Sequence, residues 1–142
     1  MDQRLEPLVG EILRSLGQPG DFPHHQVAWL EEIRRSVSAL YVALVTRPAG
    51  LWQVEAAAGS QQSLPFEAMA SALDEERPLS QGPWLLAPLP VSQDDEVALL
   101  VMAFHHGVPD DMLASSALLA EWLMAARRVV RESEVIRRRV DI

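Results

Sequence analysis

The chain has 142 residues, of which 49% are hydrophobic, and this composition is typical of one folded domain with a substantial core. The absence of cysteine excludes disulfide scaffolds, thiolate zinc sites, cysteine nucleophiles and thioether-linked chromophores. The formal net charge of −8 argues against bulk electrostatic attraction to nucleic acid or to anionic membrane surfaces.

Two helices are predicted in the N-terminal part of the chain. Residues 5–16 carry apolar side chains at the i, i+3, i+4 spacing of an amphipathic helix, and Gly17 and Pro19 end that pattern. A second amphipathic helix is expected to begin at Pro23 and to continue to Val37. Each helix therefore has one apolar side to bury.

The pattern then changes to the period of a β-hairpin. Residues 39–46 are uncharged and rich in aliphatic side chains, which predicts a central strand covered on both faces. Residues 51–58 alternate as a half-exposed second strand does. The alternation predicts that one side of this strand is apolar and consists of Trp52, Val54 and Ala56. The other side is predicted to be polar, with Gln53 and Glu55.

A short helix and two further strands are expected next. Residues 63–79 have a helical apolar stripe and a proline in the first turn, where a missing N–H costs little. Residues 84–91 predict a strand that Pro88 and Pro90 confine to a sheet edge or to an irregular conformation. Residues 96–105 predict a second buried strand.

A long last helix is predicted from Pro109 to the C-terminus, with acidic residues in its first turn. Its apolar residues repeat at spacings of three and four, as in coiled coils, and this stripe continues past the expected body of the domain. We expect two copies to pair there, in parallel if an output domain follows. The predicted dimer interface consists of Leu119, Trp122, Ala126, Val129, Ile136 and Val140.

The order of elements predicts an α+β fold, with a central antiparallel sheet flanked by helices and a long C-terminal helix. Residues 1–130 are expected to form a single domain, and residues 131–142 to extend the last helix as a coiled-coil-like linker. The predicted core of the sheet consists of Val42, Leu44, Leu99, Val101 and Ala103.

Three segments resemble the GAF domain, a sensory module of signalling proteins. Residues 40–59 look like that family's opening hairpin, whose Ala-rich second strand ends in glycine, here Gly59. Residues 85–91 are similar to its strand with a Pro-Leu pair, and residues 97–130 to its last strand and exit helix. The resemblance implies a GAF-like regulatory domain that dimerises through its terminal helices and signals to an output domain. The nucleotide-binding motif of the family and its chromophore cysteine are both absent, so no cofactor is expected.

Five apolar side chains could line a small-molecule pocket between the sheet and the short helix. The alternative is that they are ordinary packing residues, since aromatic and methionine side chains at regular spacing mostly form cores. The candidate pocket residues are Trp52, Phe66, Met69, Trp84 and Phe104.

No metal site and no catalytic site are predicted. The pairs His24-His25 and His105-His106 lack the spacing of metal ligands, and neighbouring residues of a strand point to opposite faces. No serine lies in a nucleophile-elbow motif, and no glycine-rich phosphate loop is present. We therefore expect a protein that is not an enzyme.

We expect neither a signal peptide nor a membrane span. The longest apolar run covers residues 97–104, well short of the roughly 20 residues that cross a bilayer. We expect a cytoplasmic regulatory domain whose partners are a second copy, an output domain and a small-molecule ligand. The alternative is a ligand-free interaction scaffold of the roadblock/longin type, which has a similar order of elements.

Overall fold

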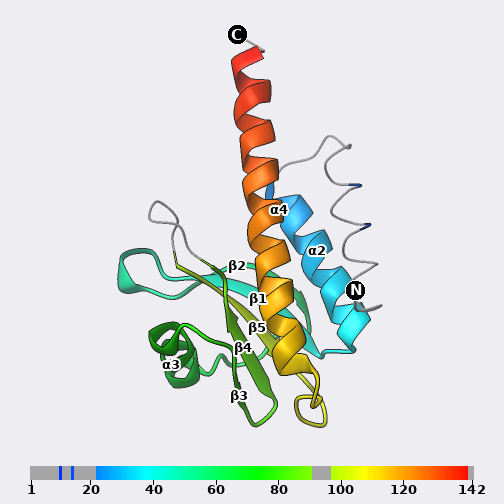
Figure 1. The fold of residues 1–142 in the computed structure, drawn as a ribbon, viewed down its shortest axis with the longest axis vertical. Coiled ribbons are helices and arrows are strands. Elements are labelled where there is room, and N and C mark those ends of the chain that lie inside the picture. The colour runs from blue at the N-terminus through cyan, green and yellow to red at the C-terminus, as the bar shows by residue number, and fades with distance from the viewer. Residues whose placement is uncertain (1–9, 11–13, 15–21, 91–96, 141–142) are drawn as a thin grey trace.

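The computed structural model describes Gly10, Arg14 and residues 22–90 and 97–140 (Figure 1). Of the helix expected over residues 5–16, only Gly10 and Arg14 are described, and both are helical. The remainder of that prediction lies outside the described residues.

Three α-helices, a short 3₁₀ helix and five strands make up the described chain. In chain order they are α2 (Phe22–Val37), β1 (Tyr41–Thr46), η2 (Pro48–Gly50), β2 (Gln53–Gly59), α3 (Phe66–Glu75), β3 (Leu79–Gln81), β4 (Trp84–Pro88), β5 (Ala98–Ala103) and α4 (Met112–Val140). The α+β fold with a long last helix is confirmed. Strand β3 was not predicted as a separate element, because three residues are too few to show a periodic pattern.

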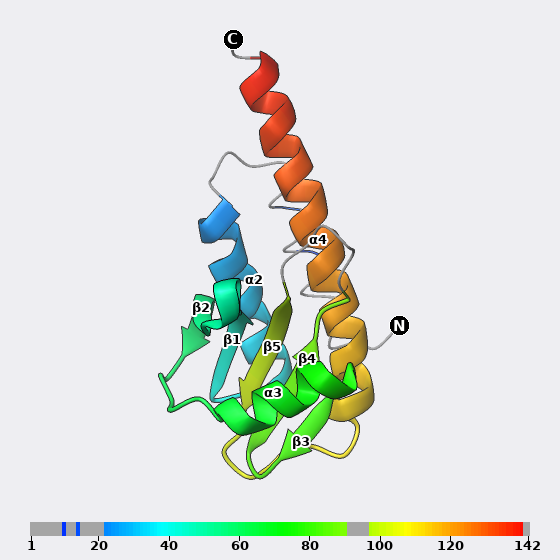
Figure 2. The same cartoon turned by 90° about the vertical axis from the view of Figure 1, so that its left-hand side faces the viewer.

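The five strands form one antiparallel sheet in the order β2-β1-β5-β4-β3. Helices α2 and α4 cover one face, where α2 contacts β1 and β2 while α4 contacts β4. Helix α3 covers the opposite face and contacts β3 and β4 (Figure 2). The two uncharged strands, β1 and β5, lie in the middle of this three-layer arrangement, as residues apolar on both faces require.

The predicted core of the sheet is confirmed, because all five residues are at most 3% exposed. They divide between the two faces. Val42 and Leu44 pack toward α2 and α4, whereas Leu99, Val101 and Ala103 pack toward α3.

A β-bulge in β2 corrects the predicted alternation of the hairpin. Leu44 pairs with Ala56 while its neighbour Val45 pairs with Val54, so Glu55 is an extra residue in the ladder. Plain alternation would place Glu55 and Ala56 on opposite faces. In the bulge both point to the face of α2 and α4, and Trp52 lies with the residues beneath α3.

Strand β4 is partly an interior strand and partly an edge. Its first three residues pair with β3, and this pairing stops at Leu86. Among the described strands, none pairs with the outer edge of Ala87 and Pro88. The N–H of Leu89 donates to the carbonyl of Ala98 in β5 (2.9 Å), so the backbone groups of Pro88 and Pro90 face the outer edge. The predicted edge position therefore applies to the second half of the strand.

Helix α4 has 29 residues and extends beyond the sheet at its C-terminal end (Figure 1). Its buried side chains lie on one side, toward α2 and β4. No helix within the described residues is both long and apolar enough to span a bilayer.

Candidate functional site

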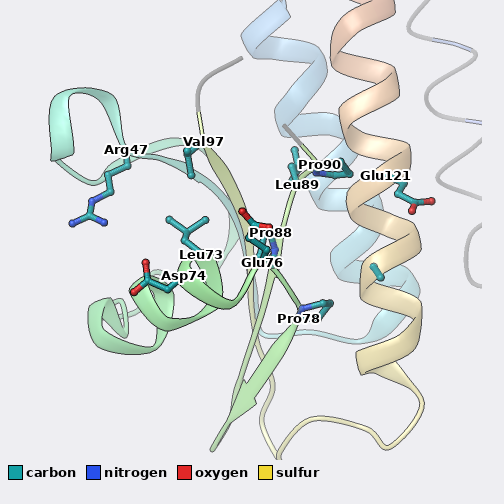
Figure 3. A pocket seen from close by; sticks show the side chains of 11 residues that line it. Arg47, Leu73, Asp74, Glu76, Pro78, Pro88, Leu89, Pro90, Val97 and Glu121 are labelled. Atoms are coloured by element: carbon teal, nitrogen blue, oxygen red, sulfur yellow. The ribbon is translucent and has the colours of Figure 1, made fainter. Parts of the chain in front are cut away.

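A groove of about 700 Å³ lies at the end of the sheet where β4 finishes and β5 begins (Figure 3). Its volume is within the range of small-molecule sites. One wall comes from the end of α3, another from α4, and the floor from the end of β4. The lining residues are Arg47, Leu73, Asp74, Glu76, Pro78, Pro88, Leu89, Pro90, Val97, Ala117 and Glu121.

The groove combines an apolar floor with charged walls. Leu73, Pro88 and Val97 supply hydrocarbon surface, while Asp74 and Glu76 supply exposed carboxylates. In the view of Figure 3, Arg47 and Glu121 stand at the two ends. Pro88 and Pro90 have no N–H, so the strand edge that faces outward here accepts hydrogen bonds but does not donate them.

Four of the five predicted pocket residues lie on the face of the sheet under α3, but the strand register places Trp52 and Trp84 at opposite ends of the strands. Met69 is fully buried, and Trp52 and Trp84 pack against the same cluster. Phe66 lies 6.5 Å from Trp52 between ring centroids and is 52% exposed. Phe104, however, packs on the opposite face with α2 and α4, because it follows Met102 by two residues along the strand direction.

The predicted pocket and the observed groove do not overlap. None of the five predicted residues lines the groove. Ala68, Met69 and Ala72 of α3 are buried against the sheet, and the two small alanines let the helix approach its strands closely. On this face, burial also raises the pKa of Tyr41, because the charged phenolate is poorly solvated there.

An exposed stack joins the β1–β2 hairpin to the start of α3. The guanidinium carbon of Arg47 lies 4.7 Å from the ring centroid of Trp52, and Arg47 Nε donates to the carbonyl of Gly50 (3.3 Å). Trp52 in turn meets Phe66. Arg47 therefore links the hairpin with one end of the groove.

On the opposite face, a buried polar cluster fastens α4 to the bulge of β2. Arg127 Nη2 donates to both carboxylate oxygens of Glu55, at 3.0 and 3.3 Å, and the side chain of Arg127 is 6% exposed. Gln26 Nε2 of α2 donates to the same carboxylate at 3.4 Å. Three elements thus meet at one bulged residue.

The predicted dimer interface is only partly on the outside of α4. Leu119 and Ala126 are buried in the core of their own chain, Trp122 is half-buried and Val129 is 44% exposed. The side chains of Ile136 and Val140 lie outside the described residues. The prediction is corrected for Leu119 and Ala126. Helix α4 buries a wider face against α2 and the sheet than the a and d positions of a heptad would form, and this face includes both residues.

A neighbouring apolar stripe, whose residues are exposed or half-buried, faces outward instead. We call it the outer stripe of α4, and it consists of Leu118, Trp122, Ala125 and Val129. Its spacing of four, three and four residues is that of the a and d positions of a coiled coil. Two of the predicted residues, Trp122 and Val129, belong to it.

The four histidines do not converge. His25 is buried and stacks on Trp29 at 6.5 Å between ring centroids, whereas His24, His105 and His106 are exposed. Within the described parts of the chain, no three histidine, aspartate or glutamate side chains are close enough to hold a metal ion.

Sequence comparisons identify neither a family nor a curated relative. No family model matches the chain. No curated protein matches it either.

Solved structures, in contrast, share its fold over almost the whole chain. A free methionine-R-sulfoxide reductase from Neisseria meningitidis has 12% identity and a TM-score of 0.72, covering 92% of this chain and 91% of its own. The GAF domain of a protein described as a sensor histidine kinase from Pseudomonas syringae pv. tomato has 23% identity and a TM-score of 0.65, covering 94% and 92%. The GAF domain of a phosphoenolpyruvate-protein phosphotransferase from Coxiella burnetii has 15% identity and a TM-score of 0.68, covering 93% and 96%. The chain therefore has the GAF-domain fold, as the resemblance implied.

One of these structures corrects an expectation. We predicted from the missing motifs that the protein is not an enzyme. The fold is shared with a reductase that was solved with its substrate, so it supports catalysis as well as regulation. The absence of familiar nucleophile motifs was therefore not sufficient ground for that prediction.

Proposed function

We propose that this chain is a regulatory domain of the GAF fold that pairs with a second copy along the outer stripe of α4 and passes conformational changes to an output domain through that helix. The observation that carries the proposal is the double role of α4. One side of the helix packs on the domain, while the other side presents exposed apolar residues at coiled-coil spacing.

The buried polar cluster gives this proposal a physical basis. Because Arg127 is almost fully buried, moving α4 away from Glu55 would leave a charge without its counter-charge in a poorly solvated place. Helix α4 therefore follows β2 when the hairpin shifts. The hairpin also carries Arg47, which lines the groove, so events in the groove can reach α4 through β1 and β2.

The first test is the oligomeric state. Val129→Asp should convert a wild-type dimer into a monomer in analytical ultracentrifugation, because pairing would bury a carboxylate without a partner. Leu113→Asp is the matched control, since Leu113 is 40% exposed on the same helix but lies on the other side from the outer stripe. The control variant should remain dimeric. A monomeric wild type at tens of micromolar would contradict the proposal, as would equal behaviour of the two variants.

A small-molecule site in the groove is a second candidate function, favoured by the volume and apolar floor of the groove. The neutral apolar dye Nile red should bind there with a rise in fluorescence. Ala117→Trp, which adds an indole to the groove wall, should weaken that binding at least about tenfold.

Ala114→Trp is the control for the dye experiment. Ala114 is an exposed alanine of the same helix, but it does not line the groove. Its replacement should leave the affinity unchanged. If the dye does not bind, or if both variants lose affinity equally, the groove is not a binding site. The remaining alternative would then be a ligand-free scaffold that acts through the helical interface.

A further inference from the structure

We infer that the α4 pair is antiparallel, with the second copy running in the opposite direction across the midpoint of the outer stripe. This inference rests on the proposed dimer. It replaces the parallel arrangement that we expected from the sequence for a chain with an output domain, because the two exit helices of an antiparallel pair leave the dimer in opposite directions. Three properties of the described residues support it: the symmetry of the stripe, the sizes of its side chains and the charges beside it.

The outer stripe is symmetric about a point between Leu123 and Met124. Leu118 and Val129 are equally far from that point along the chain, and so are Trp122 and Ala125. A two-fold axis through this point therefore places Leu118 opposite Val129 of the second copy. It also places Trp122 opposite Ala125 of the second copy. These are the a-to-d layers of an antiparallel coiled coil.

Side-chain size favours this alignment. In the antiparallel pair the largest residue of the stripe, Trp122, faces the smallest, Ala125, and a large side chain over a small one fills an interface without voids. In a parallel pair, residues of the same number face each other. Two Trp122 side chains would then meet at one level, and two Ala125 side chains would leave a gap at the next.

The charges beside the stripe favour the same alignment. Glu121 and Arg128 are both exposed and lie on the same flank of the stripe, one on each side of its midpoint. In the antiparallel pair, Glu121 approaches Arg128 of the second copy, and the symmetry makes this contact twice. A parallel pair would instead place the Glu121 of one copy and the Arg128 of the other on opposite flanks of the interface, and both contacts would be lost. It would also gather at one end the six arginines that each copy carries in residues 127–142.

The described part of each domain body does not obstruct this alignment. The buried residues of α4 are centred on the side that faces α2 and β4, and at 100° per residue the outer stripe lies roughly opposite to them. The residues of each body that the structure describes therefore lie on the far side of their own helix from the partner helix.

Disulfide cross-linking can test the direction of the pair, because the chain has no cysteine of its own. Leu118→Cys and Val129→Cys variants are oxidised separately and as an equimolar mixture, and the products are identified by mass. In the antiparallel pair the two positions meet, so the mixture should give the mixed disulfide while each variant alone gives little. Each of the two positions lies about 16 Å along the helix axis from the same position in the second copy, and this distance is far beyond the reach of a disulfide.

The opposite pattern would overturn the inference. Efficient cross-linking of each variant with itself, without the mixed product, would show a parallel pair. A dimer that forms no disulfide at all would show that the stripe is not the interface. A wild type that sediments as a monomer would refute the proposed function itself, which is a different result from either of these.

Charge reversal provides an independent readout. Glu121→Arg and Arg128→Glu should each weaken the dimer at least about fivefold, because each change turns two attractive contacts into repulsive ones. The double variant should regain the wild-type dissociation constant, since it restores both contacts with the charges exchanged. In a parallel pair the single changes would leave the affinity unaltered, and that result would contradict the antiparallel model.

Discussion

Leu99→Ala should lower the free energy of unfolding by about 2–5 kcal/mol. Leu99 is completely buried in the central strand β5, where it pairs with Val45 on one side and Pro88 on the other. Truncation removes three side-chain carbons from this close-packed layer beneath α3 and leaves a cavity that the neighbours fill only in part. Urea denaturation monitored by tryptophan fluorescence gives the change directly.

Leu113→Ala is the matched control for that measurement. The same side chain is removed, but Leu113 is 40% exposed on α4, so the loss should be below about 1 kcal/mol. If Leu99→Ala cost no more than the control, β5 would not be a buried central strand, and the sheet order would be wrong.

Glu55→Ala should lower the free energy of unfolding by about 3 kcal/mol, although Glu55 is partly accessible to solvent. The loss arises at Arg127, whose buried guanidinium would retain its charge without the two hydrogen bonds from which it now benefits. A double variant, Glu55→Met with Arg127→Met, should recover much of this loss, because replacing both partners of a buried pair by apolar residues is often neutral. Chemical denaturation of the three proteins measures each step.

Glu31→Ala is the control for the loss of an ion pair as such. Glu31 accepts hydrogen bonds from Arg34 and Arg35 on the surface of α2, and the bond from Arg34 lowers the pKa of this carboxyl. Exposed pairs of this kind contribute at most about 1 kcal/mol. If Glu31→Ala and Glu55→Ala had equal effects, or if the double variant were as unstable as Glu55→Ala, burial of Arg127 would not be the cause.

The sequence predicts the two central strands and the long helix well, because their signals are local. Residues such as Val42 and Leu99 lie in uncharged runs, and a strand covered on both faces needs such a run. The bulge at Glu55 is not predictable in this way. It is a shift in the hydrogen-bond register between two strands, and the side-chain pattern of either strand alone does not contain it.

The candidate sites were predicted less well for two different reasons. On α4 the apolar repeat was visible, but the sequence did not show which of its residues face the domain and which face outward. Leu119 and Ala126 have the same apolar spacing as the exposed residues, and they are buried by the chain itself. The lining of the groove was not predictable, since it is gathered from segments between Arg47 and Glu121 that only the tertiary fold brings together. The signal that could have been used was the pair of prolines, which indicated an open strand edge.

The two edges of the sheet have a consequence for how copies of this protein can associate. At the edge formed by β3 and the second half of β4, the outer groups of Pro88 and Pro90 cannot donate to a new strand, and β3 offers only three residues. At the other edge, the bulge at Glu55 interrupts the regular ladder of β2. An incoming strand would find no long, regular edge among the described strands, so the sheet is protected against continuation into fibrils. In the dimer that we propose, contacts between molecules would instead be made by side chains of α4, and a two-fold pairing would close the assembly at two copies.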